Sequence, residues 1–493
     1  SIGGMLSGIF VLPGIAVGIT GSSIWLAFLV AALCILPAVL SKSELATAMP
    51  KSGGTYVYIE RAFGPLFGTV SGLGLWLSLL LKSAFSLVGL SAYLYVVVQI
   101  DESLSKIVAL ISLGLILILN VFGVKKVGNT QLAIVSVSII SLLLVIAFGF
   151  NSFDSEMLSP VFSDGNYGFI SGVAFLYISY AGVTKVAAVA GEIKSPEKNL
   201  PRSMLISLFL ITVVYVLVAL VLVGNVEASA LSTDIRPIYT LSKVLGGETF
   251  GYAAGVIGVI TLLSMANSGV LASSRFPFAM ARDKMLPGFF GTVNSRFLTP
   301  LNSIIVTCII IGLAVFYLDV EKIAKLASAF KVMMFVSVNL AVIVLRETSA
   351  QWYNPKYKSP FYPYVQLFGI ISGFVLLFYL GFMPIVSVAG IFLLGFLIFL
   401  AYGKNTNRKG VFSNYGFLSF LFKGSPSGQD QTDNRQNTSS VEDISNVNAE
   451  IVVPLLGDET STEMLVEMAS SINDKSKINT INLLEVPNQT FLE

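Results

Sequence analysis

The chain has 493 residues, of which 55% are hydrophobic and 12% are charged, and its mean hydropathy is +0.82. This composition excludes an ordinary soluble protein, because too few polar side chains remain to cover a water-exposed surface. A net charge of +2 creates no field that would attract nucleic acid, so no nucleic-acid partner is expected. Because the chain has no histidine, catalytic triads and His-ligated metals are excluded, and we expect neither an enzyme nor a bound cofactor.

Apolar runs of membrane-spanning length recur along the first 402 residues. A helix needs ~20 mostly apolar residues to cross the hydrocarbon core of a bilayer. The sequence predicts an all-α polytopic membrane protein with twelve transmembrane helices, at residues 1–19, 24–49, 66–98, 105–123, 128–150, 167–192, 203–224, 250–278, 301–318, 324–345, 364–381 and 384–402. The chain opens inside the first run, so we expect this span to be clipped at its start.

The C-terminal part has a different composition. Residues 403–449 are rich in Asn, Ser, Gln and Asp and are predicted to be a polar linker. In residues 450–493, EIVVPLL and INTINLLEV read as strands around the helical pattern TEMLVEMASSI, which predicts a short α/β segment. This segment resembles the start of a universal stress protein domain. It is truncated before the phosphate-binding turn of such domains, so nucleotide binding is not predicted.

Lys and Arg are distributed unevenly among the loops. Basic residues follow the even-numbered spans, at Lys51, Arg61, Lys125, Lys126, Lys194, Lys198, Arg202, Arg282, Lys284, Arg296, Arg346, Lys356, Lys358, Lys404, Arg408 and Lys409. The opposite loops contain mainly acidic residues, among them Asp154 and Glu227. Short basic loops stay in the cytoplasm, so we expect a multi-pass protein of the cytoplasmic membrane with both termini inside.

Two of the predicted spans are interrupted by glycine. The first contains GGMLSGIFVLPG and the sixth contains ISYAGVTKVAAVAGE. Secondary transporters bind substrate where a helix is broken at the bilayer midplane, because freed backbone groups serve as ligands there. Small residues in either span also suit close helix packing, which is the alternative explanation. Spans one and six would be equivalent positions if five spans repeat, inverted, in the next five.

Several motifs in order resemble one family. SGIFVLPG in the first span, SELATAMPKSGGTYVYIERAFGP after the second, GVTKVAAVAGEIKSPEKNLPRS in the sixth and RFPFAMARDKMLP after the eighth are similar to segments of the amino acid–polyamine–organocation permeases. LRETSAQWYNPKYKSPFYPYVQLFG is similar to a later connection in prokaryotic permeases that carry a stress-protein domain. The resemblance implies a LeuT-like 5+5 inverted repeat with two extra helices. It also implies secondary transport of amino acids by alternating access.

The resemblance also implies where an amino acid would bind. Its carboxylate would meet amides at the start of a half-helix, at Ser7, Gly8 and Ile9. Its ammonium would meet carbonyls near Gly3, Gly4, Ser179 and Tyr180, with Gly182 at the sixth-span break. From their positions alone, the candidates for the side-chain pocket are Tyr177, Tyr180 and Met265. Aromatic residues in a helical bundle also serve in ordinary packing, so that alternative stays open.

The sequence leaves two coupling ions open, H⁺ and Na⁺, because this chain departs from its apparent relatives. Counting from Gln131 places Ser138 where proton-coupled members have a lysine, and Ser264 lies where sodium-coupled relatives ligate Na⁺. The alternative is that Ser264 bonds to the backbone of its own helix, as intramembrane serines more often do. Lys82 lies near the middle of the third span, where an ammonium usually marks a function. The alternative is that it snorkels without a role.

Other intramembrane charges are expected to be peripheral. Lys185 and Lys331 are expected to be solvated or snorkelling. No carboxylate is expected deep in a span, since Glu44 and Glu192 lie at cytoplasmic ends, and a carboxylate proton relay is therefore not expected.

Three functions remain open from the sequence. The first is an ion-coupled amino acid transporter, driven by H⁺ or Na⁺. The second is an inorganic ion transporter on the same fold, of the cation–chloride or K⁺ type, with Lys82 as an anion ligand. The third is a sensor that has lost transport, which the intact glycine-rich breaks disfavour. The oligomeric state is not predicted.

Overall fold

The structure of the protein is a computed structural model. It describes residues 2–49, 54–98, 104–122, 127–193, 195–297, 299–348, 353–402, 410–411, 451–455 and 478–482. Contacts divide the chain into two units, Ser1–Gly416 and Phe417–Glu493. The predicted division at residues 402 and 449 remains a prediction.

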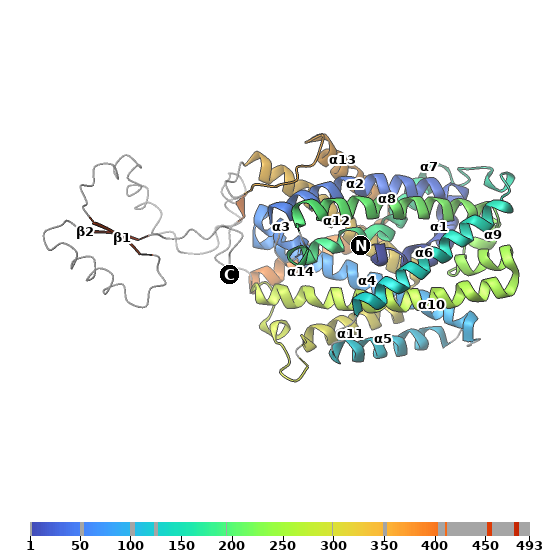
Figure 1. The fold of residues 1–493 in the computed structure, drawn as a ribbon, viewed down its shortest axis with the longest axis horizontal. Coiled ribbons are helices and arrows are strands. Elements are labelled where there is room, and N and C mark those ends of the chain that lie inside the picture. The colour runs from blue at the N-terminus through green and yellow to red at the C-terminus, as the bar shows by residue number, and fades with distance from the viewer. Residues whose placement is uncertain are drawn as a thin grey trace. The chain divides into compact units, whose positions relative to one another are not determined.

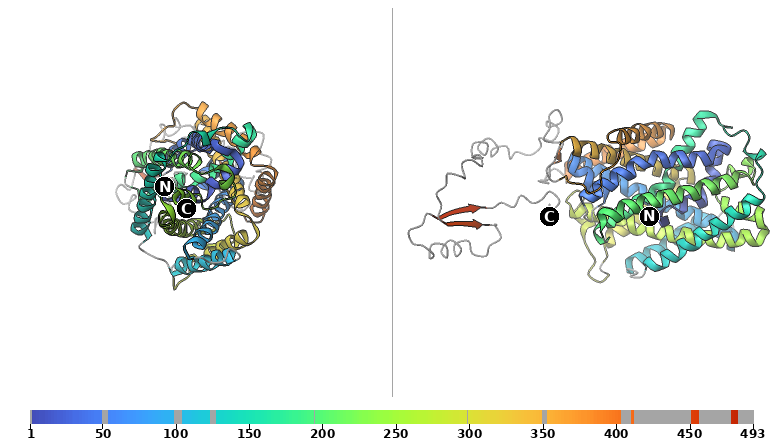
Figure 2. Two further views of the ribbon diagram at one scale, coloured as in Figure 1. Left: turned by 90° about the vertical axis from the view of Figure 1, so that its right-hand side faces the viewer. Right: turned by 45° about the horizontal axis from the view of Figure 1, so that its top comes forward.

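The first unit consists of helices that run side by side along its length (Figure 1). Figure 2 shows the same bundle from its end and from a second side. The α-helices are α1 (Ser7–Thr20), α2 (Ile24–Ala48), α3 (Thr55–Phe63), α4 (Pro65–Val98), α5 (Ser105–Phe122), α6 (Val127–Asn151), α7 (Gly165–Leu176), α8 (Pro196–Val223), α9 (Ala228–Leu231), α10 (Pro237–Arg282), α11 (Leu301–Tyr317), α12 (Val320–Glu347), α13 (Tyr364–Tyr379) and α14 (Phe382–Ala401). The 3-10 helices are η1 (Ile2–Gly4), η2 (Gly21–Ser23), η4 (Glu156–Leu158), η5 (Tyr177–Glu192) and η6 (Gly288–Gly291).

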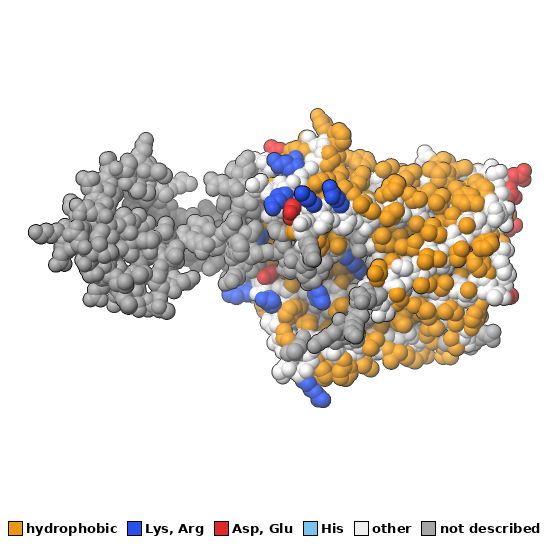
Figure 3. All heavy atoms as spheres, viewed as in Figure 1, with side chains coloured by type: hydrophobic (Ala, Val, Ile, Leu, Met, Phe, Trp, Pro, Cys, Tyr) orange, Lys and Arg blue, Asp and Glu red, His pale blue; other side chains and the backbone are white. Residues whose placement is uncertain are grey.

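The outer surface of this bundle is apolar over a broad band (Figure 3). Large exposed hydrophobic side chains come from several helices, for example Ile111, Leu132, Phe209, Ile309, Phe378 and Leu393. Lipid solvates such a surface, whereas water does not. Among the described residues, nine segments are long and apolar enough to cross a membrane, and α11 and α13 are shorter apolar helices. The predicted all-α, multi-pass membrane protein is confirmed, while the number of twelve spans and the inverted repeat remain predictions.

Helices occupy the ranges in which the sequence predicts spans, with one clear difference. The eighth span was expected to begin at residue 250, whereas α10 begins at Pro237. Gly246 and Gly247 interrupt its helical backbone, and Gly247 has a φ of 73°. Glycine adopts this left-handed conformation without strain, so the chain bends here and continues as helix on both sides.

The centre of the bundle is α4. It packs against α10, α12, α3 and α14, and its residues are buried along most of its length. α2 packs against α8, α12 and α13. Lys and Arg side chains gather at the end of the bundle where α2 ends and α4 begins, and acidic side chains gather at the opposite end (Figure 3).

The second unit contains two described strands, β1 (Ile451–Leu455) and β2 (Ile478–Asn482). They pair in parallel, with Ile451 opposite Ile478. Parallel neighbours need a crossover connection, which is usually a helix. The helix predicted between them lies outside the described residues, as does most of the predicted linker, so the α/β segment remains a prediction.

Candidate functional site

The first helical segment is interrupted between η1 and α1. η1 ends at Gly4, a two-residue turn follows, and α1 begins at Ser7. The amides of Gly8 and Ile9 donate to carbonyls three residues earlier, at 3.0 and 3.2 Å. In this conformation these two amides are therefore engaged within the chain, and they would have to leave these carbonyls to meet a carboxylate. The fully buried hydroxyl of Ser7 has no hydrogen-bond partner among the described residues.

The sixth predicted span changes from α7 to the 3-10 helix η5. Carbonyls near this change are satisfied by side chains from other helices. Ser328 of α12 donates to the carbonyl of Phe175 at 3.1 Å. Lys82 of α4 donates through Nζ to the carbonyls of Ile178 and Ser179, at 3.2 and 3.4 Å. Buried carbonyls need such partners in a membrane interior, so these contacts stabilise the altered helix.

The two interruptions touch each other through glycine. A Cβ atom on Gly182 would lie 2.4 Å from the carbonyl carbon of Gly4 and 2.5 Å from its oxygen. A Cβ atom on Gly8 would lie 2.7 Å from Oγ of Ser179 and 2.9 Å from its Cα. Only glycine permits backbones to approach this closely. The helix breaks and the close packing that the sequence analysis treated as alternatives are therefore both present.

Lys82 and Lys331 are buried cations. Lys82 lies midway along α4 with 6% of its surface exposed, and Lys331 lies within α12 with 3% exposed. Nζ of Lys331 is 3.5 Å from Oγ1 of Thr184 and 4.6 Å from the ring centroid of Phe335. The prediction that Lys331 is solvated or snorkelling is wrong, because α12 turns this side chain toward η5 rather than toward a helix end.

Lys185 of η5 lies near Lys82 and Lys331. Its side chain is half-buried and contacts Gly4, since a Cβ atom there would lie 3.1 Å from Cδ of Lys185. The ammonium groups of Lys185 and Lys331 lie within electrostatic range of Lys82, and Lys331 lies within range of the buried Lys42 on α2. Lys82 of α4 and Lys331 of α12 therefore contact the interrupted sixth segment, which carries Lys185 itself, and Lys42 of α2 lies near Lys331.

A small cavity lies where η1, α1, α4, η5 and α10 meet. Its volume is about 10 Å³, and it is lined by Gly4, Ser7, Leu79, Lys82, Ser83, Ser86, Lys185, Met265 and Gly269. The predicted residues Gly4, Ser7, Lys82 and Met265 are thus brought together. About this volume is needed for one water molecule, so the cavity would have to open to admit an amino acid.

The predicted aromatic residues pack into the core in this conformation. The Tyr180 hydroxyl donates to the Phe28 carbonyl at 3.0 Å, and its ring centroid lies 5.3 Å from that of Tyr215. The Tyr177 ring lies 5.8 Å from that of Phe335. Tyr215 was not apparent from the sequence, yet its hydroxyl donates at 2.6 Å to a carbonyl in the turn before α1. Neither Tyr177 nor Tyr180 lines the small cavity.

The predicted coupling serines lie at the contact between α6 and α10. Ser138 donates to the Ile134 carbonyl at 2.7 Å, and its Oγ is 2.6 Å from Oγ1 of Thr261. Ser264 lies one helical turn after Thr261 and is half-buried. A sodium site at Ser264 stays a prediction.

A larger space of about 550 Å³ connects this region with the surface, and we name it the vestibule. Its lining includes Gly3, Gly4, Gln131, Lys185, Ser207, Ser268 and Arg275. Gly4 and Lys185 line both the vestibule and the small cavity. Because Arg275 and Leu132 are exposed, the vestibule opens to the surface of the bundle.

Glu44 at the end of α2 forms a separate buried cluster. Its carboxylate is fully buried and accepts two hydrogen bonds from Arg346, at 2.7 and 2.6 Å. Tyr353 and Ser359 donate to the same carboxylate. The sequence correctly places Glu44 at a helix end, but this position is covered by the segment between α12 and α13.

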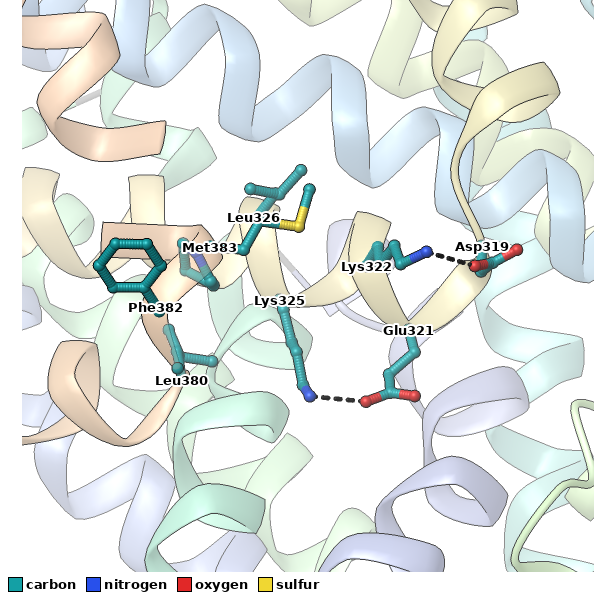
Figure 4. Close-up of a pocket in the computed structure, with 10 residues that line it drawn as sticks. Asp319, Glu321, Lys322, Lys325, Leu326, Leu380, Phe382 and Met383 are labelled. Atoms are coloured by element: carbon teal, nitrogen blue, oxygen red, sulfur yellow. Dashed lines mark hydrogen bonds and ion pairs between the residues drawn. The ribbon is translucent and has the colours of Figure 1, made fainter. Parts of the chain in front are cut away.

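A third space, of about 330 Å³, lies between the start of α12 and the turn joining α13 to α14 (Figure 4). Its charged residues pair with each other, Lys322 with Asp319 at 2.9 Å and Lys325 with Glu321 at 2.6 Å. None of its lining residues belongs to the two interrupted segments. It is therefore distinct from the region around Lys82.

Residues 1–409 match a protein-family model described as amino acid permease. This match covers the whole helical bundle, including both interruptions, the vestibule and the buried lysines. It ends before β1 and says nothing about the similarity of residues 450–493 to a stress-protein domain, which remains a prediction.

The chain is also similar to characterised transporters. It is 28% identical to the branched-chain amino acid permease BcaP of Lactococcus lactis subsp. cremoris, over 81% of this chain and 91% of that protein. It is 26% identical to the serine/threonine exchanger SteT of Bacillus subtilis, over 75% of this chain and 86% of that protein. It is 27% identical to the methylthioribose transporter of Bacillus subtilis, over 80% of this chain and 88% of that protein.

Proposed function

This chain belongs to the amino acid permease family, and we propose that it is a secondary transporter that carries amino acids across the cytoplasmic membrane by alternating access. The observation that carries the proposal is the contact between two interrupted helices, Gly4 against Gly182 and Gly8 against Ser179. Beside this contact lie the unpartnered hydroxyl of Ser7 and the ammonium of Lys82. Interrupted helices that meet deep in a bundle suit a substrate with both a carboxylate and an ammonium.

The substrate would bind between η1, α1 and η5. Its carboxylate would accept hydrogen bonds from the hydroxyl and amide of Ser7. The amides of Gly8 and Ile9 would also donate to it, once the break opens and they leave the carbonyls that they now contact. Its ammonium would donate hydrogen bonds to carbonyls near Gly4 and Ser179. The side chain would extend toward Met265, and Tyr177, Tyr180 and Gly182 would adjust around it.

Two unequal spaces support the proposal of alternating access. The vestibule of about 550 Å³ reaches the surface, whereas the cavity beside Lys82 holds only about 10 Å³. A change that widens the small cavity and narrows the vestibule would move the substrate through the bundle.

The basic end of the bundle is proposed to face the cytoplasm, which places both termini inside. A cysteine introduced at Ser155 in a cysteine-free background is expected to react with an impermeant thiol reagent on whole cells, and one at Ser195 is not. The reverse labelling pattern would overturn this orientation.

Uptake is proposed to be coupled to protons through Lys82. An ammonium buried among other cations, with Lys185 and Lys331 nearby, can release its proton in one facing state and regain it in the other. The alternative is Na⁺ bound at Ser264, next to the contact that Ser138 makes with Thr261. The two alternatives differ in which ion gradient drives accumulation.

Transport by the purified full-length chain in liposomes tests these proposals. Radiolabelled amino acids are expected to enter by counterflow, and to accumulate under an inward proton gradient when Na⁺ is replaced by choline. Lys82→Met is expected to lose accumulation, because the group that carries the proton is gone, and to keep exchange only at higher substrate concentration, because one hydrogen-bond donor in the small cavity is gone as well. Lys322→Met, which changes an exposed lysine paired with Asp319, serves as the control.

Each contrary outcome has a separate meaning. Accumulation that collapses without Na⁺ would replace the lysine mechanism with the Ser264 site. If no amino acid enters, and chloride or K⁺ is carried instead, the protein is an inorganic ion transporter on the same fold.

A further inference from the structure

We propose that the amino acids carried by this protein bear a net negative charge, with a second carboxylate in the side chain. This inference rests on the proposed function, since it names the class of substrate for the same site. It follows from the charges that line the route to the two helix breaks.

The residues lining this route include cations and no acids. Lys82 and Lys185 line the small cavity, and Lys185 and Arg275 line the vestibule. None of the described residues around either space is an aspartate or glutamate. A substrate with a net positive charge would meet like charges at each step, and such juxtapositions are strongly unfavourable.

The lysines lack carboxylate partners within the part of the chain that the structure describes. The ion pairs found there join Lys243 to Glu248, Lys322 to Asp319, Lys325 to Glu321 and Arg346 to Glu44. Lys82 donates only to two carbonyls, and Lys331 only to a threonine hydroxyl. Buried charges in proteins are normally paired, so these groups suit an anion that arrives from outside the chain.

One carboxylate is not enough to offset these cations. An ordinary amino acid brings a carboxylate and an ammonium, so its net charge is zero and its ammonium is repelled by the same lysines. A second carboxylate adds the missing negative charge beside Lys82 and Lys185. It also lessens the mutual repulsion among Lys82, Lys185 and Lys331, which lie within electrostatic range of one another.

The polar groups beside the lysines suit the binding of a carboxylate. An ammonium has three N–H donors, and two carbonyl contacts leave one donor of Lys82 for a ligand. Ser7 adds a buried hydroxyl without a partner. Hydrogen bonds between ionised groups are shorter and stronger than neutral ones, so a carboxylate is favoured over an amide of the same shape.

Glutamate and glutamine form a matched pair for the test, because they have nearly the same size and differ in one charge. In liposomes containing the full-length chain, glutamate counterflow is expected to exceed glutamine counterflow by at least ~10-fold at low concentration, with aspartate and asparagine behaving likewise. Lysine and arginine are expected to be excluded. Replacing external and internal chloride by gluconate is expected to leave both the preference for glutamate and the exclusion of lysine and arginine unchanged.

Variants of Lys185 test whether the preference for glutamate over glutamine arises at the small cavity and the vestibule, which this residue lines. Lys185→Met is expected to reduce the preference for glutamate over glutamine by ~10-fold, whereas Lys185→Arg keeps the charge and the preference. Lys322→Met, on the exposed start of α12, is expected to leave the preference unchanged. The wild-type comparison decides the question even if a variant fails to fold.

The outcomes separate this inference from the proposed function. Equal or preferred transport of glutamine, or uptake of arginine, would overturn the charge inference while amino acid transport stands. Uptake of neutral amino acids that requires chloride would overturn it too, because the lysines would then hold an inorganic anion. If no amino acid is carried, the proposed function itself fails.

Discussion

Replacing Gly182 by alanine is expected to abolish amino acid transport while the chain still folds and inserts. The added Cβ would lie 2.4 Å from the carbonyl carbon of Gly4 and 2.8 Å from the amide nitrogen of Met5. These are backbone atoms, so the two interrupted helices must separate. Overpacking of this kind costs ~1–3 kcal/mol, which a large bundle can absorb, but it moves the groups proposed to hold the substrate. Counterflow at equal protein density measures the effect.

Gly114→Ala is the matched control for this substitution. Gly114 lies in α5, and a Cβ atom there would have no neighbour within 4 Å. Gly8→Ala should resemble Gly182→Ala, because its Cβ would lie 2.9 Å from Cα of Ser179. Wild-type counterflow by Gly182→Ala would mean that the contact between the two breaks is not the substrate site.

Replacing Arg346 by methionine is expected to cause the largest loss of stability. The fully buried carboxylate of Glu44 would lose two charged hydrogen bonds, leaving Tyr353 and Ser359 as its donors. Removing one partner of a buried ion pair typically costs ~3–5 kcal/mol. Because the Arg346 side chain is 19% exposed, we expect a loss of about 3 kcal/mol. The melting temperature of the purified protein in detergent measures it.

Two control variants show whether the loss of stability comes from the buried pair of Arg346 and Glu44 or from any change of charge. Arg346→Lys keeps the charge but not the two-pronged geometry, so it should lose less stability than the methionine variant. Lys243→Met breaks an exposed pair, with side chains 48% and 74% exposed, and should leave the melting temperature unchanged. A melting temperature of Arg346→Met equal to that of the wild type would show that this cluster does not hold α2 to α12.

Hydropathy was sufficient to predict where the helices lie, because lipid requires long apolar runs with paired backbone groups. The glycine pattern likewise predicted that the first and sixth segments are irregular. The bend at Gly246 and Gly247 was missed, because the helical stretch before it is short and contains Ser242 and Lys243, so it does not form an apolar run of membrane-spanning length. Glycine alone does not distinguish a bend from a helix end.

The direction in which side chains point could not be predicted from the sequence. Lys331 was expected near solvent because charges usually lie at helix ends, yet α12 turns it toward η5. Glu44 was placed at a helix end, and nothing in its own segment indicates that Arg346 and Ser359, some three hundred residues later, bury it. Tyr180 lies beside a break in sequence, but its ring packs against Tyr215. Such contacts depend on which helices become neighbours.

Density for an amino acid bound to the purified full-length protein would show where the substrate binds. We expect the amino acid to lie between η1, α1 and η5, with its backbone carboxylate at Ser7 and Gly8 and its side-chain carboxylate beside Lys82 and Lys185. An amino acid found instead between the start of α12 and the turn joining α13 to α14, where Lys322 and Lys325 are paired, would contradict it.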